Sequence, residues 1–380
     1  MRRRRPASQV TCTARGGDTP SCACGPHAHC CDRGGAEQRR VRDALVRAGL
    51  QPVTRTVRCR VDARALREYR DTAGPEVDVV PTHKTGQSYG LTRRQLIDRL
   101  LGCVEQEDKE GMGCTHISYR HSRLGAELVA AGHVTESREY AVQRAPDPFA
   151  LPRALRRLAF ARVGYDLDDA ASFPRAKAAV VVPCRAAVRF FLAHRAEIMR
   201  QMGAYFFGGS SLTDAERRDR IKALFNSLDM DGTYSAWRVR MGIADGTLPA
   251  AAMVVDLGAS GRFDFAAYRN AQAVGASWLA DRLPAMRAFV VAHLRNERDA
   301  KRLEHPERTL ASYVFQEAEG VSRQAKVRWA VQQGHTVLNL EHDGVVLAFE
   351  PGVGVAQAER DLRRACSHAL GYDQPVEHKP

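Results

Sequence analysis

Two separate groups of acidic residues have the type and spacing for metal chemistry. Residues 341–344 read Glu-His-Asp-Gly between two apolar runs, and an Asp-Gly pair in that setting predicts the turn of a β-hairpin carrying Asp343. Far upstream, Asp166 and Asp168 alternate with apolar residues, which places both carboxylates on one face of a short strand. Two carboxylates on one face repel each other unless a cation or a proton lies between them.

An Asp at a strand end, a second Asp on a hairpin and a basic chain together suggest two-metal phosphoryl or nucleotidyl transfer. Asp-Gly also suits a tight turn for purely structural reasons, so the upstream acidic segment is what favours a metal site. Chemistry alone does not choose between Asp166 and Asp168. The chain has 380 residues, a net charge of +13 and a pI near 9.5, which favours a polyanionic partner, most simply a nucleic acid.

The upstream segment resembles motif A of template-directed polymerases, in which a bulky gate residue follows the Asp five residues later. Asp168 and Phe173 have this spacing, and Pro174 follows Phe173 as in the family B pattern. This spacing selects Asp168 over Asp166. The sequence further predicts that Pro174 ends the strand and that Arg175 opens a helix.

The hairpin resembles motif C of family A polymerases. His342-Asp343 matches the start of their His-Asp-Glu, and Gly344 stands where Glu is expected. The resemblance of the whole chain covers about residues 115 to 350.

Between these segments, residues 217–237 are similar to motif B. Arg218 and Lys222 keep the family A spacing, and Lys222, Asn226 and Ser227 keep the family B spacing. The Tyr-Gly ending of both families is absent.

A further likeness is to polymerase-like proteins of large DNA viruses and protists. Their motif B runs into Gly-Ser-Tyr-x-x-Trp, which is close to residues 232–237 here. A Gln-x-x-Glu helix precedes their motif C, as Gln316 and Glu319 do in this chain.

The resemblance implies a template-directed DNA polymerase that extends a primer with dNTPs using two Mg²⁺ ions, with Mn²⁺ as a substitute. Asp168 and Asp343 would hold the metals, and Phe173 would exclude a ribose 2′-hydroxyl. The secondary metal ligands would be Asp166, Asp169 and Glu341. The nucleotide would be held by Arg218, Lys222 and Asn226, with Tyr234 or Trp237 stacked on the nascent base pair. The nucleic-acid contacts would be Arg144, Arg153, Arg156, Arg157 and Gln316, the last on one helix face with Glu319 and Arg323.

The elements that must position these residues divide the chain into three regions. Residues 1–35 are predicted to be a disordered, basic, Cys-rich tail; the spacing of their Cys and His residues is not that of a standard finger, so no specific Zn²⁺ site is expected. Residues 36–160 are expected to form a thumb-like nucleic-acid-binding region. Residues 161–380 are expected to hold the palm and fingers, with motif A at 165–175, motif B at 217–237 and motif C at 337–349.

Local patterns predict most of the helices. Capping boxes at Thr92 and Thr213 each have a Gln or Glu three residues later and predict helix starts. The remaining expected elements are a helix at 36–49, a strand at 53–61, a long helix at 175–201 bent near Pro183, two helices within 265–297, single helices at 306–333 and 354–370, and a frayed stretch over the last ten residues.

The expected fold class is therefore α+β: a small antiparallel polymerase-like palm sheet with helical fingers and a helical N-terminal region. The expected partners are a DNA primer-template and dNTPs, with no membrane because no apolar run is long enough to span one. The expected location is intracellular, nuclear rather than organellar. A reverse-transcriptase-like enzyme and a catalytically inactive nucleic-acid-binding relative remain alternatives.

Overall fold

The computed structural model describes residues 55–72, 79–81, 88–106, 113–141, 153–229, 232–243 and 253–379. The chain divides into two compact units, and the described residues all belong to the second, Pro52–Pro380. The predicted tail at 1–35 and the helix expected at 36–49 lie outside the described residues. In the part of the chain that is described, no helix has both the length and the apolar character needed to cross a membrane.

A four-stranded antiparallel sheet carries both acidic segments. Its strand order is β10-β11-β7-β12. The strands are β10 (Thr336–Leu340), β11 (Val345–Ala348), β7 (Tyr165–Asp169) and β12 (Val376–His378). The β10–β11 hairpin confirms the turn predicted from Asp-Gly, and β7 confirms the predicted upstream strand.

A second antiparallel sheet lies in the region before β7, where a helical region was expected. Its strands are β1 (Arg55–Val61), β5 (Gly113–His121), β4 (Glu105–Gln106) and β6 (Glu139–Ala141), and β5 pairs with all the others. Helices α2 (Ala63–Thr72), α3 (Arg93–Leu101), α4 (Arg123–Ala130) and α5 (Arg153–Phe160) accompany it. The expected helical N-terminal region is therefore corrected to a region of mixed helix and sheet. Buried side chains alternate along β5 as well as along the predicted strand β1.

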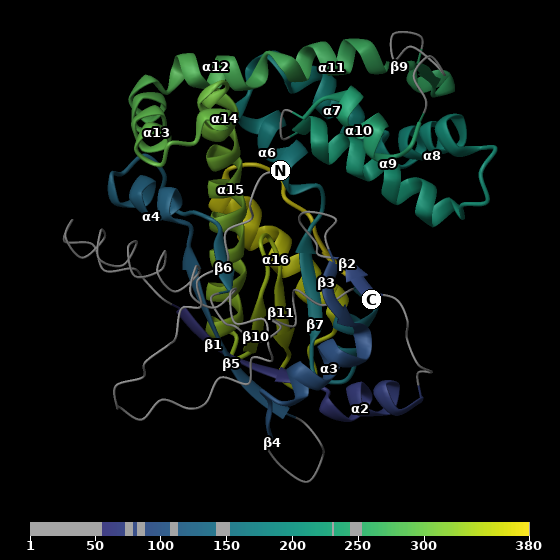
Figure 1. Cartoon of the computed structure of the whole chain (residues 1–380), viewed down its shortest axis with the longest axis vertical. Coiled ribbons are helices and arrows are strands. Elements are labelled where there is room, and N and C mark those ends of the chain that lie inside the picture. Colours follow the sequence, from purple (N-terminus) through teal and green to yellow (C-terminus); the bar gives the residue numbers. More distant parts are fainter. Residues whose placement is uncertain are drawn as a thin grey trace, which may run out of the picture. The chain divides into compact units, whose positions relative to one another are not determined.

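Helices form most of the chain between β7 and β10 (Figure 1). They are α6 (Ser172–Val180), α7 (Arg185–Ala193), α8 (Arg195–Phe207), α9 (Asp214–Asp229), α10 (Tyr234–Arg240), α11 (Phe265–Ala273), α12 (Gly275–Arg282), α13 (Pro284–Asn296), α14 (Ala300–Leu303) and α15 (Pro306–Gln332). Helix α16 (Val355–Leu370) follows the hairpin and packs along α15. Two small hairpins complete the described elements: β2 (Val79–Pro81) with β3 (Ser88–Thr92), and β8 (Val254–Asp256) with β9 (Arg262–Asp264).

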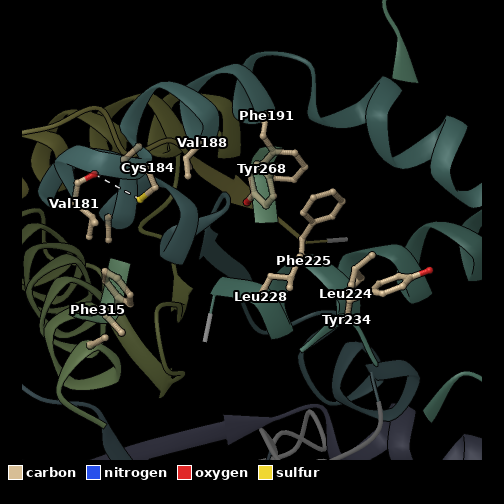
Figure 2. Packing of buried hydrophobic residues seen from close by; sticks show 14 of the residues in the cluster. Val181, Cys184, Val188, Phe191, Leu224, Phe225, Leu228, Tyr234, Tyr268 and Phe315 are labelled. Atoms are coloured by element: carbon tan, nitrogen blue, oxygen red, sulfur yellow. Dashed lines mark hydrogen bonds between the residues drawn. The ribbon is translucent and has the colours of Figure 1, made fainter. Parts of the chain in front are cut away.

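The buried side chains fall into two hydrophobic clusters. The first lies mainly among helices α6 to α13, with side chains added by α4 and α15. Within it, Phe191 stacks on Phe225 at 4.1 Å between ring centroids, and both contact Tyr268 (Figure 2). The second fills the space between the two sheets and their helices. Helix α15 contributes Phe315 to the first cluster and Ala330 to the second, so this single helix ties the two cores together.

Several local predictions are confirmed and several are corrected. Both capping boxes form, with the amide of Gln95 donating to Thr92 and the amide of Glu216 donating to Thr213. The helix expected to open at Arg175 starts three residues earlier, and Pro174 lies within its first turn, where no backbone donor is needed.

The long helix predicted at 175–201 is interrupted twice. It breaks at the 3-10 turn Val182–Cys184, which contains Pro183, and again at His194. Residues 265–297 form three helices, because a break at Val274 adds to the one before Pro284. The last ten residues were expected to fray, but they contain β12, which pairs with β7 through the buried Val376.

Candidate active site

The carboxyl end of β7 lies beside the hairpin turn. Leu167 is paired with Val345 in antiparallel register, so the residues after Leu167 face the residues before Val345. The turn is closed by the amide of Glu341, which donates to the carbonyl of Gly344 at 2.9 Å. The structure therefore brings Asp168, Asp169 and Asp343 to one end of the sheet, although they come from segments far apart in the sequence.

Gly344 allows the close approach of Asp168 to the turn. A Cβ at Gly344 would lie 2.9 Å from Asp168 Oδ1 and 3.2 Å from the carbonyl oxygen of Leu167. Asp168 Oδ1 is buried and accepts no hydrogen bond. The motif C resemblance leads one to expect Glu at position 344. Because Gly344 has no side chain, the Asp168 carboxylate can occupy the space beside it.

Asp169 is neutralised from inside the protein. Its Oδ1 lies 2.6 Å from Lys326 Nζ of α15, and both side chains are fully buried. Lys326 Nζ also donates to the main-chain carbonyl of Asp343. Burial raises the pKa of Asp169 to about 6; Lys326 opposes this rise and Asp343 adds to it. Burial alone would lower the pKa of Lys326, but Asp169 raises it above its usual value.

Arg323, one turn earlier on α15, holds the rest of the hairpin turn. Its Nη1 donates to the carbonyls of Glu341 at 3.3 Å and of His342 at 3.2 Å. Its Nη2 donates to Glu139 of β6 at 2.9 Å, and both of these side chains are buried. Arg323 and Lys326 together therefore fix three successive carbonyls of the turn, which leaves the Asp343 carboxylate in a defined position.

Glu319 and Arg138 form a third, largely buried ion pair near the turn. Arg138 Nε donates to Glu319 Oε2 at 2.9 Å. Burial raises the pKa of Glu319 to about 8; Arg138 opposes this rise, and the charge of Asp343 adds to it. The Arg138 guanidinium also lies 5.7 Å from the centroid of the Phe173 ring, whose edge contacts Phe315. Phe173 is thus held in place beside the acidic end of β7.

Asp166 lies two residues before Asp168 on β7 and contacts a different cation. Arg156 Nε lies 3.9 Å from Asp166 Oδ2, and Arg156 Nη1 lies 3.6 Å from Glu341 Oε1. The predicted nucleic-acid residue Arg156 is therefore engaged inside the protein, whereas its neighbour Arg157 is exposed. Arg144 and the side chain of Arg153 lie outside the described residues.

Asp168 itself pairs with Lys379, which follows β12. Lys379 Nζ contacts Asp168 Oδ2, and the Lys379 amide donates to the carbonyl of Asp166 at 2.8 Å. The Lys379 side chain keeps 31% of its surface exposed, whereas that of Lys326 keeps none. The C-terminal segment is thus part of the site.

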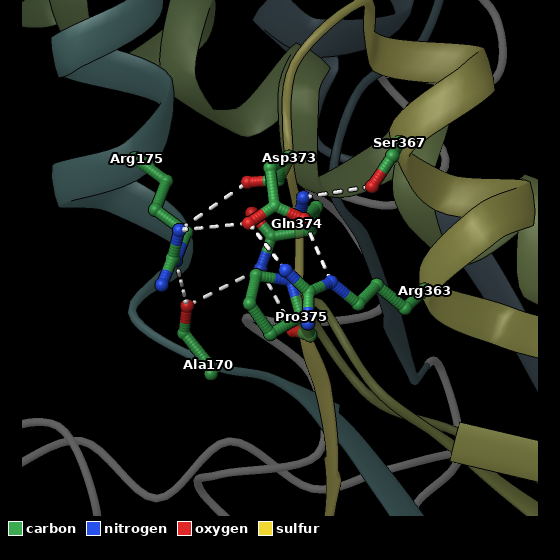
Figure 3. A network of polar contacts seen from close by, with 7 residues as sticks. All are labelled: Ala170, Arg175, Arg363, Ser367, Asp373, Gln374 and Pro375. Carbon is green, nitrogen blue, oxygen red and sulfur yellow. Dashed lines mark hydrogen bonds and ion pairs between the residues drawn. The ribbon is translucent and has the colours of Figure 1, made fainter. Parts of the chain in front are cut away.

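A polar network holds this segment against the turn between β7 and α6 (Figure 3). The amide of Ala170 donates to the carbonyl of Pro375 at 2.9 Å, and Arg175 Nε donates to the carbonyl of Ala170 at 3.0 Å. The next residue, Ala171, has φ of 56°, a conformation that costs an L-residue energy. The network therefore stabilises a strained turn next to the acidic strand end.

Helix α9 presents basic and polar side chains to solvent. Arg218, Lys222 and Asn226 are spaced four residues apart, and all three are exposed on one face. Burial raises the pKa of Asp343; Lys326, Arg138 and Lys222 oppose this rise, so the charge of Lys222 acts on the hairpin Asp. The predicted triphosphate-binding face of α9 is thus electrostatically coupled to the turn.

The aromatic residues after α9 face the protein interior. Trp237 is buried and its Nε1 donates to the carbonyl of Arg220 at 3.0 Å, so its ring belongs to the helical core. Tyr234 stacks on Trp237 and lines a pocket of 340 Å³ together with Arg269 and Arg308. Gln316 is also buried, and its Nε2 donates to Ser312 at 2.9 Å. Within the described ranges, no hydrogen bond or ion pair joins these three side chains to Asp168 or Asp343.

The acidic end of β7 has a donor set that fits a divalent cation. Carboxylate oxygens are hard ligands, and Mg²⁺ is commonly held by one or two carboxylates with waters and substrate phosphates. Asp168 contributes a buried oxygen without a hydrogen bond, and Asp343 lies on the adjoining turn. Across the described ranges, no three or more His, Cys, Asp or Glu side chains are grouped to hold a metal ion.

Sequence reasoning missed Lys326, Lys379 and Glu139. A signal for Lys326 was present, since it lies three residues after Arg323 and seven after Glu319 and therefore extends the polar face of that helix. Lys379 and Glu139 carry no local signal, because their partners Asp168 and Arg323 lie far from them in the sequence.

Comparison with solved structures gives a distant structural likeness. No protein-family model matches the chain, and no curated protein is significantly similar to it. Among solved structures, the chain is similar to the POL domain of Pol1 from M. smegmatis, in complex with DNA primer-template and dNTP. The identity is 14% and the TM-score 0.43, and the match covers 91% of this chain and 64% of that one. The chain thus spans less than two thirds of that structure's length.

Proposed function

We propose that this chain is a template-directed DNA polymerase, which extends a primer with deoxynucleotides at the carboxyl end of β7. The observation that carries the proposal is the convergence of Asp168 and Asp343 at one end of an antiparallel sheet. In this proposal the sheet β10-β11-β7-β12 is the palm, helices α8 to α10 are the fingers, and the region before β7 contacts the primer-template.

Asp168 and Asp343 would hold Mg²⁺ or Mn²⁺ in this proposal. Such an ion, when bound, lowers the pKa of the attacking 3′-hydroxyl and neutralises charge on the pyrophosphate that leaves. The chain's own contribution is to orient the two carboxylates. Lys326 and Arg323 do so by fixing the main chain of the turn on which Asp343 lies.

The exposed face of α9 would bind the triphosphate. Arg218 offers a guanidinium fork and Lys222 a compact charge, which are the two kinds of cation that proteins use for phosphates. Phe173 would lie under the sugar and exclude a 2′-hydroxyl. Its ring is held by Phe315 and Arg138, so it cannot turn away to admit a ribonucleotide at low cost.

Primer extension on a DNA template with Mg²⁺ tests the proposal. The wild-type chain is expected to extend the primer, and Asp343→Asn is expected to lower the rate by about 10²-fold or more, because a ligand of the ion that would stabilise the developing charge is lost. Asp281→Asn, an exposed Asp on α12, is the matched control and should keep full activity. Phe173→Ala should accept ribonucleotides.

Each failure of this assay has a defined meaning. Absence of extension by a folded wild-type chain on both DNA and RNA templates would reject the polymerase proposal. Extension on RNA but not on DNA would instead identify a reverse-transcriptase-like enzyme. Equal losses in Asp343→Asn and Asp281→Asn would show that Asp343 has no special role.

One observation favours a second candidate, a catalytically inactive DNA-binding relative. Lys326 and Lys379 already supply positive charge to Asp169 and Asp168, so the acidic end is neutralised by the protein itself. An inactive relative would bind a primer-template with a steep dependence on salt. It would show no extension in any metal, and Asp343→Asn would leave its DNA affinity unchanged.

A further inference from the structure

Lys326 lies between the acidic strand end and the hairpin turn. Its Nζ is 2.6 Å from Asp169 Oδ1 and donates to the carbonyl of Asp343. Neither side chain of this ion pair is exposed. Helix α15 carries Lys326 and is packed against α6, α12, α13, α16 and the hairpin strands along its length. The ammonium is therefore held at a fixed position in the site.

This position limits how many divalent ions the acidic end can hold. In two-metal sites the ions lie roughly 3.5–4 Å apart, so both must be held by the same small group of carboxylates. An ion shared by Asp169 and Asp343 would lie next to a buried ammonium. Repulsion between charges in a buried site is screened far less than in water. The fixed ammonium thus disfavours an ion on the Asp169 side.

The Asp168 side of the strand differs in this respect. Its partner Lys379 lies near the surface with 31% of its side chain exposed, and the second carboxylate oxygen of Asp168 accepts no hydrogen bond. A lysine that is partly exposed can turn its ammonium into solvent at less cost than a buried one, because its charge is already partly hydrated. Asp168 is therefore open to a cation, whereas Asp169 is not.

We propose that Lys326 is a fixed cation in place of one of the two expected metal ions, so that the site takes a single divalent ion on Asp168 and Asp343. The inference rests on the proposed function for the identity of these two ligands. Lys326 acts as a positioning residue: an ammonium donates hydrogen bonds and carries charge, and it has no lone pair or vacant orbital to replace a metal in the reaction itself.

The number of Mn²⁺ ions bound by the full-length chain tests this inference. Titration followed by electron paramagnetic resonance and by calorimetry should give one ion per wild-type chain. Lys326→Met should admit a second ion, because the Asp169 carboxylate is then without its cation. The matched variant Lys379→Met should still bind one ion, but more tightly, because a competitor for Asp168 is removed. Asp168→Asn should weaken binding at least about tenfold, the effect expected for losing even an outer partner of a metal site.

The outcomes separate this inference from the proposed function. Two ions on the wild-type chain would overturn the inference and leave the proposed function standing. No ion on the wild-type chain would overturn the metal-dependent function itself. If Lys326→Met does not fold, the uncharged pair Lys326→Gln with Asp169→Asn replaces it. Retention of one ion by that pair supports the inference, and loss of the ion overturns it by making Asp169 a ligand.

Discussion

At the scale of single residues, the site depends on how closely the hairpin turn approaches β7. Gly344 has no side chain, and the space beside it holds the carboxylate of Asp168 and the carbonyl of Leu167. Both groups belong to a central strand that is paired on both sides, so neither can move far. The distance between the turn and the acidic strand end is thus set by the size of residue 344.

Gly344→Ala is expected to destabilise the fold and to impair Mn²⁺ binding. The new Cβ would lie 2.9 Å from Asp168 Oδ1, closer than real Cβ contacts, so either the turn or the carboxylate must shift. Overpacking of this kind costs about 1–3 kcal/mol. Urea unfolding measures the loss of stability. Gly209→Ala, where nothing lies within 4 Å, is the control and should change stability by no more than about 0.5 kcal/mol. Equal stability of the two variants would contradict the close approach described here.

At the scale of elements, the sequence predicted those helices and strands whose ends are marked by a capping residue or a turn residue. Thr92 and Thr213 mark helix starts through capping boxes, and Asp343-Gly344 marks the hairpin. The strand β12 was missed because Val376–His378 has no alternating pattern long enough to notice, and its stability comes from pairing with β7. Its short length leaves no local pattern from which the pairing could be read.

The candidate site was predictable to a similar extent. The polymerase resemblance implied a site that contains Asp168 and Asp343, and the antiparallel register of β7 and β11 brings their two segments to one end of the sheet. It could not show that Lys326 would be buried against Asp169, because a charged residue on a helix is usually exposed. Nor could it show that Arg156 faces Asp166 and not solvent, since that depends on how α5 packs against the sheets.

The role of α15 as the support of the turn gives a second prediction. Arg323→Met removes the cation that pairs with buried Glu139, and breaking a buried pair on one side costs about 3–5 kcal/mol. The double variant Arg323→Met with Glu139→Gln should recover part of that loss, because no buried charge is then left unpaired. Urea unfolding of the wild type, the two single variants and the double variant completes the cycle. A double variant less stable than Arg323→Met alone would show that the pair is not what holds the turn.

At the scale of the whole molecule, the acidic site lies within a strongly basic chain. The net charge of +13 favours binding of a nucleic-acid backbone over a broad surface. Each phosphate contacted by a Lys or Arg releases counterions, so the affinity for DNA falls steeply as salt is added. Not every Arg contributes to the salt dependence of DNA binding, because some form ion pairs with the chain's own carboxylates.

Neighbouring arginines on α5 separate these two roles. Arg157 is exposed, whereas Arg156 contacts Asp166 and Glu341. We expect Arg157→Ala to reduce the slope of log K against log salt by about 1 for a primer-template duplex, as for loss of one phosphate contact. Arg156→Ala should leave that slope unchanged and instead lower the midpoint of urea unfolding, because two carboxylates lose their shared cation. Fluorescence anisotropy across a range of salt concentrations measures the slopes. A lower slope in Arg156→Ala together with an unchanged one in Arg157→Ala would mean that Arg156 leaves its carboxylates when DNA binds, and that the acidic strand end opens as the primer-template arrives.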